Sequence, residues 1–265
     1  MPFCVLVVMT VSLFKGKYIM EAETKKAGIL AMSLMVGLRI AILFIWVFVK
    51  LAEEVLEDNL ERFDNSIIGF FESLQTSALD TIYTLITELG SVWFVASASV
   101  VVVLLLWFKA KDKWATLLFI IAIGGNGALT WLLKQIYERG RPSINEAIDA
   151  VGFSFPSGHS MGSLVFYGFL IYLVLRSNQR KAVKISASMA LGVLVLLIGT
   201  SRIYLGAHFP SDIIAGYIAG TIWLVVCVLA LEWIQWQRNS QVHLGHALQG
   251  LLLYNYGAHK HNRKQ

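Results

Sequence analysis

Charged residues are scarce in this sequence, and their scarcity limits what kind of protein it encodes. Asp, Glu, Lys and Arg make up 15% of the 265 residues, apolar residues make up 57%, and the mean hydropathy is +0.65. Soluble domains carry about 25% charged and roughly 45–50% apolar residues. The composition therefore argues against a soluble domain and indicates an integral membrane protein.

Cysteine is almost absent, which bears on disulfides and metal centres. Cys4 and Cys227 both lie in apolar stretches, as small buried side chains do, so we expect neither a disulfide nor a metal site there. The sequence also contains no internal repeat and no long low-complexity linker, which favours a single membrane domain.

The N-terminus lacks the positively charged leader of a signal peptide. Its first 14 residues are apolar but too short to span a membrane. Met20 opens a polar run directly before the first long apolar block. We interpret residues 1–27 as a cytoplasmic segment, with the hypothesis that 1–19 are an upstream extension or follow a mis-assigned start.

Six long apolar blocks predict six membrane spans. A transmembrane helix needs roughly 20 mostly apolar residues, and such blocks lie near residues 30–51, 91–108, 114–133, 160–176, 185–200 and 213–233. We therefore predict an all-α, six-span transmembrane helical bundle over residues 28–235 and a cytoplasmic tail over 236–265. The tail holds four histidines, which solvation explains more simply than a metal site: His243, His246, His259 and His261.

The net charge of +5 could suggest a nucleic-acid partner, but the positions of the basic residues indicate membrane orientation instead. They follow the second, fourth and sixth blocks, at Lys109, Lys111, Lys113, Arg176, Arg180, Lys181, Lys184, Arg238, Lys260, Arg263 and Lys264. Cytoplasmic loops collect Lys and Arg, so we predict a cell-membrane protein with both termini cytoplasmic. Residues 52–88 carry nine acidic residues and one basic residue, Arg62, and belong on the extracytoplasmic side.

The acidic segment between the first two spans has the pattern of an amphipathic helix. Its apolar residues recur at steps of three and four, at Leu56, Leu60, Phe63, Ile67, Phe71, Leu74, Ala78, Ile82, Leu85 and Leu89. We expect it to pack on the bundle as a structural cap, or to lie at the outer interface. A role in admitting a lipid substrate is the alternative.

The third predicted span contains the sequence Gly124-Gly125-Asn126-Gly127. Small residues let membrane helices approach closely, and an asparagine can hydrogen-bond across their interface. Helix packing is the favoured role, and substrate contact is the alternative.

Three polar segments occur where the predicted topology places the extracytoplasmic face. They cover residues 134–142, 156–159 and 201–212. Lys134, Arg139, Arg141 and Arg202 are thus basic residues on the side that should be poor in them. An anionic ligand would explain this placement, because Arg suits bidentate contact with phosphate and Lys acts as a point charge.

Two predicted helices start beside these cations. Spans four and six begin directly after Pro156-Ser157-Gly158 and Phe209-Pro210-Ser211, and helix N-termini bind anions through their free N–H groups. Gly158 lets the backbone approach an oxyanion closely, and Ser157 supplies a hydroxyl donor. We expect both helix starts to contribute to the anion site.

Both histidines outside the tail lie in these polar segments. His208 and Asp212 are four residues apart across a helix start, so the carboxylate can accept from one imidazole nitrogen and leave the other as a nucleophile. His159 can protonate the leaving oxygen as a general acid. These groups suit phosphoryl transfer, in which positioning and charge stabilisation supply most of the catalysis.

The motifs Lys-x6-Arg-Pro, Pro-Ser-Gly-His and Ser-Arg-x5-His-x3-Asp over residues 134–212 resemble the signature of the type 2 phosphatidic acid phosphatase superfamily. That family includes bacterial lipid phosphatases, lipid phosphate phosphatases and, more distantly, glucose-6-phosphatase and the vanadium haloperoxidases. The resemblance implies a phosphohistidine on His208, oriented by Asp212, with His159 as the acid and no metal ion or other cofactor. The phosphate-binding residues that it implies are Lys134, Arg141, Ser157, Gly158 and Arg202; Arg139 lies outside the signature, with headgroup contact as one option.

We therefore expect hydrolysis of a lipid phosphate or pyrophosphate by a protein whose compact form resembles bacterial membrane enzymes. Candidate substrates are phosphatidylglycerol phosphate, phosphatidic acid, diacylglycerol pyrophosphate and undecaprenyl pyrophosphate, and the only other partners expected are membrane lipids. Haloperoxidase activity is disfavoured because that branch is soluble. The alternative is a non-catalytic phospholipid-binding or transport protein with the same cradle, although a binder needs no nucleophile or acid. The oligomeric state stays open.

Overall fold

The computed structural model describes residues 28, 32, 35–142 and 152–262, with side chains as far as Arg238. The proposed extension at 1–19, Cys4 and the side chains of the tail histidines lie outside this part. The chain divides into two compact units, one of residues 1–37 with 229–265 and the other of residues 38–228. In the first unit, the side chain of Leu229 packs directly on the backbone of Gly37.

Six helices among the described residues are long and apolar enough to cross a membrane. They are Met35–Leu56, Val92–Lys109, α5 (Lys113–Tyr137), α6 (Gly158–Arg176), α7 (Lys181–Tyr204) and Pro210–Arg238 of α8 (Pro210–Asn262). The second span consists of α4 (Val92–Leu104) and the π-helical turn η1 (Leu105–Lys109). The described part of the chain contains helices and no strand, so the predicted all-α, six-span fold is confirmed.

Polar residues at the borders of the apolar runs set the helix starts. The Ser91 hydroxyl accepts from the Phe94 N–H (3.2 Å) at the start of α4, and the Asp112 carboxylate accepts from the Ala115 N–H (3.0 Å) at the start of α5. Such caps satisfy N–H groups that have no partner inside the helix. The helix α8 continues to Asn262, beyond the predicted span, because Pro210 is the last proline in the sequence and nothing later breaks the helix in the same way.

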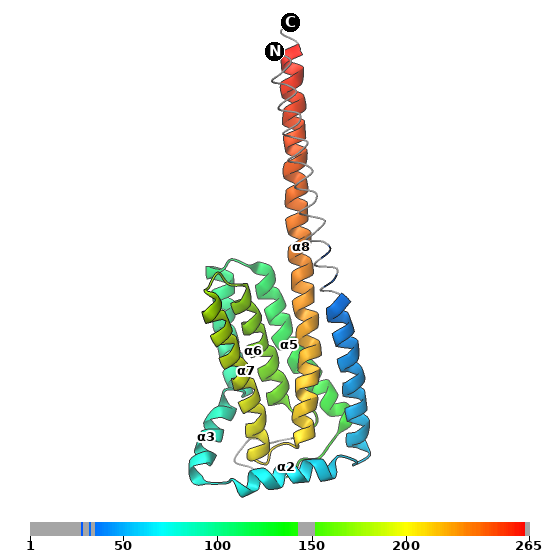
Figure 1. Cartoon of the computed structure of the whole chain (residues 1–265), viewed down its shortest axis with the longest axis vertical. Helices are drawn as coiled ribbons and strands as arrows, with labels where there is room; N and C mark the ends of the chain where they lie inside the picture. Colours follow the sequence, from blue (N-terminus) through cyan, green and yellow to red (C-terminus); the bar gives the residue numbers. More distant parts are fainter. Residues whose placement is uncertain (1–27, 29–31, 33–34, 143–151, 263–265) are drawn as a thin grey trace. The chain divides into compact units, whose positions relative to one another are not determined.

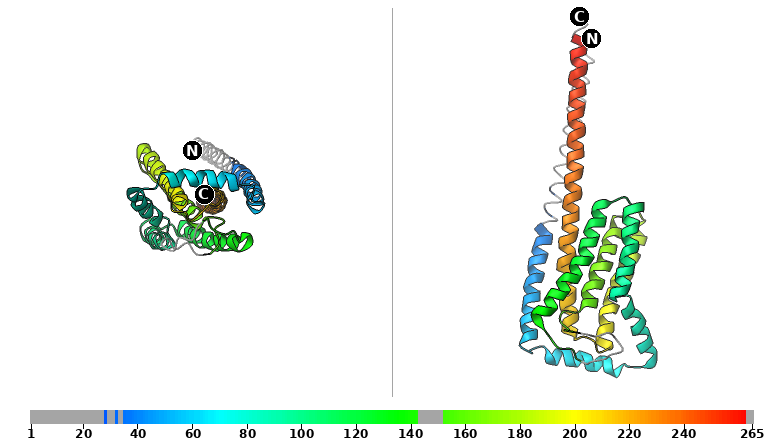
Figure 2. Two further views of the ribbon diagram at one scale, coloured as in Figure 1. Left: turned by 90° about the horizontal axis from the view of Figure 1, so that it is seen from below. Right: turned by 180° about the vertical axis from the view of Figure 1, so that it is seen from behind.

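The amphipathic segment between the first two spans is helical, as predicted, but it forms two helices. These are α2 (Glu61–Ser73) and α3 (Ser77–Glu88). Thr76 separates them, because its hydroxyl accepts from the Leu79 N–H (3.3 Å) and caps α3. In Figures 1 and 2, α2 lies across one end of the bundle, and α3 leads back along α7, against which it packs.

Helix α6 lies at the centre of the bundle and packs against α4, α5 and α7. Its Phe169 meets Phe119 of α5 edge to face, with ring centroids 5.2 Å apart. Large apolar side chains such as Trp93 and Trp131 are exposed on the outside, as a lipid-facing surface allows. The C-terminal ends of α5 and α7 and the N-terminal ends of α6 and α8 share the end that α2 crosses (Figure 1).

Candidate active site

The residues predicted to carry chemistry gather at the end of the bundle that α2 crosses. Lys134 lies in the last turn of α5, His159 in the first turn of α6 and Arg202 in the last turn of α7. His208 lies in the short connection before α8, and Asp212 lies in the first turn of α8. Lys134 is within electrostatic range of Arg202 and Asp212, and His159 is within range of His208. The structure therefore brings the three polar segments together.

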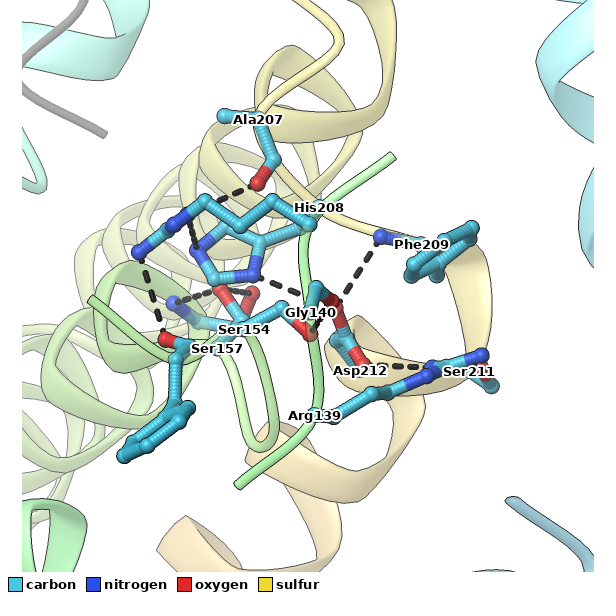
Figure 3. A network of polar contacts seen from close by, with 12 residues as sticks. Arg139, Gly140, Ser154, Ser157, Ala207, His208, Phe209, Ser211 and Asp212 are labelled. Atoms are coloured by element: carbon cyan, nitrogen blue, oxygen red, sulfur yellow. Dashed lines mark hydrogen bonds and ion pairs between the residues drawn. The ribbon is translucent and has the colours of Figure 1, made fainter. Parts of the chain in front are cut away.

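The predicted pair of His208 and Asp212 is formed and buried. Nδ1 of His208 lies 3.3 Å from Oδ2 of Asp212, and the two side chains are 3% and 0% exposed. The same Oδ2 accepts from the backbone N–H of Phe209 (3.1 Å). Figure 3 shows Asp212 held between Phe209, His208 and Arg139.

The contact with Arg141 indicates which nitrogen of His208 carries the proton. Its Nη1 lies 3.2 Å from Nε2 of His208 and donates to the carbonyl of Ala207 (2.7 Å). A guanidinium can only donate, so Nε2 accepts and the imidazole proton resides on Nδ1, directed at Asp212. The unprotonated Nε2 thus accepts from the Arg141 guanidinium.

The protonation of His208 follows from its surroundings. Burial, helped by the charges of Arg141 and Lys134, lowers the pKa of His208 from 6.5 to about 4, even though Asp212 acts in the opposite direction. Burial likewise lowers the pKa of Arg141, which Asp212 partly offsets. His208 is consequently neutral near pH 7 while Arg141 stays charged.

Two further predicted cations line the site from neighbouring helices. Lys134 donates from Nζ to the carbonyl of Phe153 and lies 3.5 Å from the carbonyl of Ser154. Arg202 is 2% exposed and donates from Nη1 to the hydroxyl of Thr87 (2.9 Å), which belongs to α3. Its Nε is buried without a hydrogen-bond partner among the described residues. A buried donor of this kind is costly to leave unsatisfied, which suits a ligand oxygen at that position.

The start of α6 has the geometry expected for an anion site. Ser157 is the N-cap: its hydroxyl accepts from the Ser160 N–H (3.4 Å) and the Ser160 hydroxyl (3.1 Å). Its own hydroxyl proton is therefore still available for donation. The N–H groups of Gly158 and His159 precede the first intrahelical hydrogen bond, which Met161 donates to the Ser157 carbonyl (3.0 Å).

The structure contradicts the expectation that the start of α8 also binds the anion. The N–H of Ser211 donates to Oδ1 of Asp64 (2.9 Å), and the N–H of Phe209 donates to Asp212. The protein's own carboxylates thus occupy the positive end of this helix. The prediction of two helix starts at the anion is wrong for α8, and α6 remains.

Arg139 joins these two carboxylates, a role that the sequence did not reveal. Its Nη1 donates to Oδ1 of Asp212 (2.6 Å) and to the hydroxyl of Ser211 (2.8 Å), and its Nη2 donates to Oδ2 of Asp64 (2.8 Å). The guanidinium carbon also lies 4.1 Å from the ring centroid of Phe209. Arg139 therefore holds Asp212 on the side away from His208 and ties α2 to the start of α8.

One sequence signal could have identified Asp64. It lies four residues after Leu60 and three before Ile67, which places it beside the apolar stripe of α2 rather than on the polar face. An acidic residue at such a position is buried on packing and requires a partner. Asp64 is indeed 1% exposed.

His159 faces a cavity that extends from the site into the apolar part of the bundle. The cavity has a volume of about 350 Å³ and is lined by His159, Gly158 and Lys134, by Asn126 and Trp131 of α5, and by Val95 of α4. A second cavity of about 330 Å³ between α4 and α5 shares Ala96 and Ile123 with it. The two cavities therefore adjoin each other along α4 and α5.

Gly125 and Asn126, in the glycine-rich sequence of α5, lie in different environments. At Gly125, a Cβ would lie 2.3 Å from the indole of Trp223, so this glycine permits close packing of α5 on α8. Asn126, its neighbour, lines the cavity that holds His159. Packing thus accounts for Gly125 but not for Asn126.

The described residues include one of the two cysteines. Cys227 is a buried free thiol, as predicted. Within residues 35–142 and 152–238, no group of three or more His, Cys, Asp or Glu side chains could hold a metal ion.

Comparison with known proteins assigns the chain to a family. The family model of the PAP2 superfamily matches residues 113–236. Phosphatidylglycerophosphatase B of Bacillus subtilis is 31% identical over 180 residues, which cover 66% of this chain and 86% of the relative. A putative undecaprenyl-diphosphatase of Escherichia coli is 29% identical over 126 residues, covering 46% of this chain and 59% of the relative.

The fold agrees with a solved structure from the same family. The crystal structure of a transmembrane PAP2-type phosphatidylglycerolphosphate phosphatase from Bacillus subtilis superposes with a TM-score of 0.67 at 27% identity, covering 73% of this chain and 96% of that one. Sequence, fold and the arrangement of polar residues lead to the same assignment. The chain belongs to the PAP2 superfamily and is a multi-pass membrane lipid phosphatase.

Proposed function

We propose that this phosphatase hydrolyses its lipid phosphate through a phosphohistidine on His208, without a metal ion. Asp212 orients the imidazole, and His159 is the general acid. The phosphoryl oxygens bind Lys134, Arg141, Ser157, Gly158 and Arg202. The observation that carries the proposal is the contact between Arg141 Nη1 and His208 Nε2 (3.2 Å), because it supports an unprotonated, nucleophilic nitrogen next to a phosphate-binding cation.

The reaction has two balanced steps. In the first, the Nε2 lone pair of His208 attacks phosphorus, the P–N bond forms, the bond to the lipid oxygen breaks, and His159 gives that oxygen its proton. In the second, His159 accepts a proton from water, whose oxygen attacks phosphorus; the P–N bond breaks and its electrons return to His208, releasing inorganic phosphate. Arg141 turns from Nε2 to a phosphoryl oxygen when the P–N bond forms, and bidentate binding is available to it.

A lipid rather than a soluble phosphate ester is supported by the cavity beside His159. The leaving group must lie next to the acid that protonates it, and His159 lines a cavity whose other walls are mostly apolar residues of α4 and α5. The candidates are phosphatidylglycerol phosphate, phosphatidic acid, diacylglycerol pyrophosphate and undecaprenyl pyrophosphate.

One experiment tests both which lipids are hydrolysed and whether a phosphohistidine forms. Purified protein in EDTA is assayed for phosphate release from these four lipids, with His208→Ala, His159→Ala and, as a matched control, the tail variant His243→Ala. We expect wild-type and control activity on at least one lipid, loss in both site variants, inhibition by vanadate, and a ³²P-labelled, acid-labile and alkali-stable enzyme that His208→Ala does not form. Activity retained by His208→Ala would exclude the phosphohistidine, and binding without turnover by the wild type would favour the non-catalytic alternative.

We also propose that the site lies on the extracytoplasmic side, with both termini in the cytoplasm. Support comes from the basic residues that follow the second, fourth and sixth spans. Gln75, between α2 and α3, and Asn178, between α6 and α7, are both exposed and can each be replaced by a single cysteine. A membrane-impermeant maleimide should label Gln75→Cys in intact bacteria and label Asn178→Cys only after lysis; the reverse pattern would invert the topology.

A further inference from the structure

Two polar side chains on the walls of the cavities between α4 and α5 have no hydrogen-bond partner among the described residues. They are Oγ of Ser99 and Oδ1 of Asn126, and the residues are 8% and 9% exposed. Other hydroxyls of the same helices bond back to the backbone, as Ser97 does to the Trp93 carbonyl (2.7 Å) and Thr130 to the Asn126 carbonyl (2.8 Å). Leaving such groups unpaired in an apolar region is unfavourable, and hydrocarbon cannot supply the missing hydrogen bond.

The two groups line adjoining cavities between α4 and α5. Asn126 lines the cavity that contains His159, Ser99 lines the adjoining one, and Ala96 and Ile123 line both. A ligand that enters beside His159 and continues between α4 and α5 therefore passes both polar groups. We call this space the α4–α5 groove, defined by Ala96, Ser99, Ile123, Asn126 and His159.

Asn126 lies about one helical turn deeper than the catalytic end of the groove. Its Nδ2 is 3.6 Å from the position of a Cβ on Gly162, and Gly162 follows His159 by three residues, or about 4.5 Å along α6. In a diacylglycerol phosphate, the ester carbonyls are only a few bonds from the phosphate oxygen that leaves. With the leaving oxygen at His159, the esters thus reach the depth of Asn126.

We infer that Asn126 and Ser99 form a subsite for the ester carbonyls of a glycerol-based phospholipid, a conclusion that rests on the proposed function. The Ser99 hydroxyl donates directly, and the Asn126 carboxamide donates through Nδ2 after rotation about χ2. A polyprenyl chain has no polar atom at this depth and leaves both groups unpaired. The subsite therefore favours diacylglycerol phosphates over polyprenyl phosphates.

The test compares lipids that differ only in the carbonyls. Full-length enzyme in mixed micelles is assayed for kcat/KM on a diacyl phosphatidic acid, its dialkyl ether analogue of equal chain length, and a polyprenyl phosphate. We expect the wild type to prefer the ester over the ether by about tenfold, as a hydrogen bond or two would give. In Ser99→Ala and Asn126→Leu this ratio should fall toward one, with kcat/KM for the ether and the polyprenyl phosphate changed less than about twofold.

Ser97→Ala is the matched control, because Ser97 is exposed on the same helix and bonds to its own backbone; its ester-to-ether ratio should equal that of the wild type. An equal rate on ester and ether by an active wild-type enzyme, or a ratio that survives in Ser99→Ala and Asn126→Leu, would overturn the subsite and leave the proposed function intact. A wild type inactive on every lipid would refute the proposed function, and the subsite with it.

Discussion

Arg139 is shared by two buried carboxylates, and Arg139→Gln tests whether Asp212 depends on it. Its guanidinium lies 2.8 Å from Asp64 and 2.6 Å from Asp212, whose side chains are 1% and 0% exposed. Removing one partner of a buried ion pair costs about 3–5 kcal/mol of unfolding free energy. The lost hydrogen bond to the charged Asp212 is worth about 1.5–3 kcal/mol; if that loss appears as misorientation of His208, kcat falls roughly 10- to 150-fold.

A double variant separates stability from positioning. In Asp64→Asn/Arg139→Gln, no unpaired charge is left at Asp64, so the unfolding free energy should recover by about 0.5–3 kcal/mol relative to Arg139→Gln alone. Asp212 still lacks its cation, so kcat should stay low. KM should change little in the double variant, because its two substitutions together leave the net charge of the site unchanged.

The assay measures chemical unfolding in detergent micelles alongside kcat and KM on a short-chain phosphatidic acid. Arg62→Gln is the control, since Arg62 is exposed on α2, and it should behave as the wild type. A wild-type kcat in stable Arg139→Gln enzyme would refute the positioning role. A raised KM with unchanged kcat would instead assign Arg139 to the lipid headgroup.

Three further predictions concern single groups. Burial lowers the pKa of His208 to about 4, so ¹⁵N-histidine NMR should show this imidazole neutral from pH 8 down to about pH 5, and a titration near pH 6.5 would contradict this. Because the unfolded state binds the proton first, the contribution of His208 to the unfolding free energy should be lost as pH falls from 6.5 through 4. Thr87→Val removes the Nη1 partner of Arg202 and should weaken vanadate inhibition by about tenfold, whereas an unchanged inhibition constant would show that Thr87 does not position Arg202. Gly216→Ala places a Cβ 2.8 Å from the Ser157 carbonyl and should cost about 1–3 kcal/mol of unfolding free energy, whereas Gly192→Ala, with open space around it, should cost nothing.

The fold, and the grouping of most residues of the candidate site, could be predicted because their signals are local in the sequence. Apolar blocks mark the spans, and the spacing from Lys134 to Asp212 contains the groups that the helix ends bring together. Arg139 and Asp64 are 75 residues apart, and nothing in the local pattern of either one names the other. The use of the α8 start was mispredicted for the same reason: a helix N-terminus attracts an anion, but only tertiary structure shows that Asp64 is that anion.

From the charge balance of the site, we predict that Arg139 and Asp64 influence phosphate binding as well as the fold. The four basic side chains Lys134, Arg139, Arg141 and Arg202 lie with the carboxylates of Asp64 and Asp212, and the carboxylate of Glu88, at the end of α3, acts on Arg202. Because His208 is neutral, the site keeps a net positive charge, which suits a phosphate monoester of about −1.5 to −2 at pH 7. Asp64→Asn should therefore tighten the binding of vanadate and inorganic phosphate, and Arg139→Gln should weaken it, since the two changes alter the site's charge in opposite directions. Inhibition constants measured at low and high salt test this, because salt screening should reduce the change in the inhibition constant of each variant. A loss of affinity in both variants would mean that the Asp64–Arg139 pair matters only as a structural contact between α2 and α8.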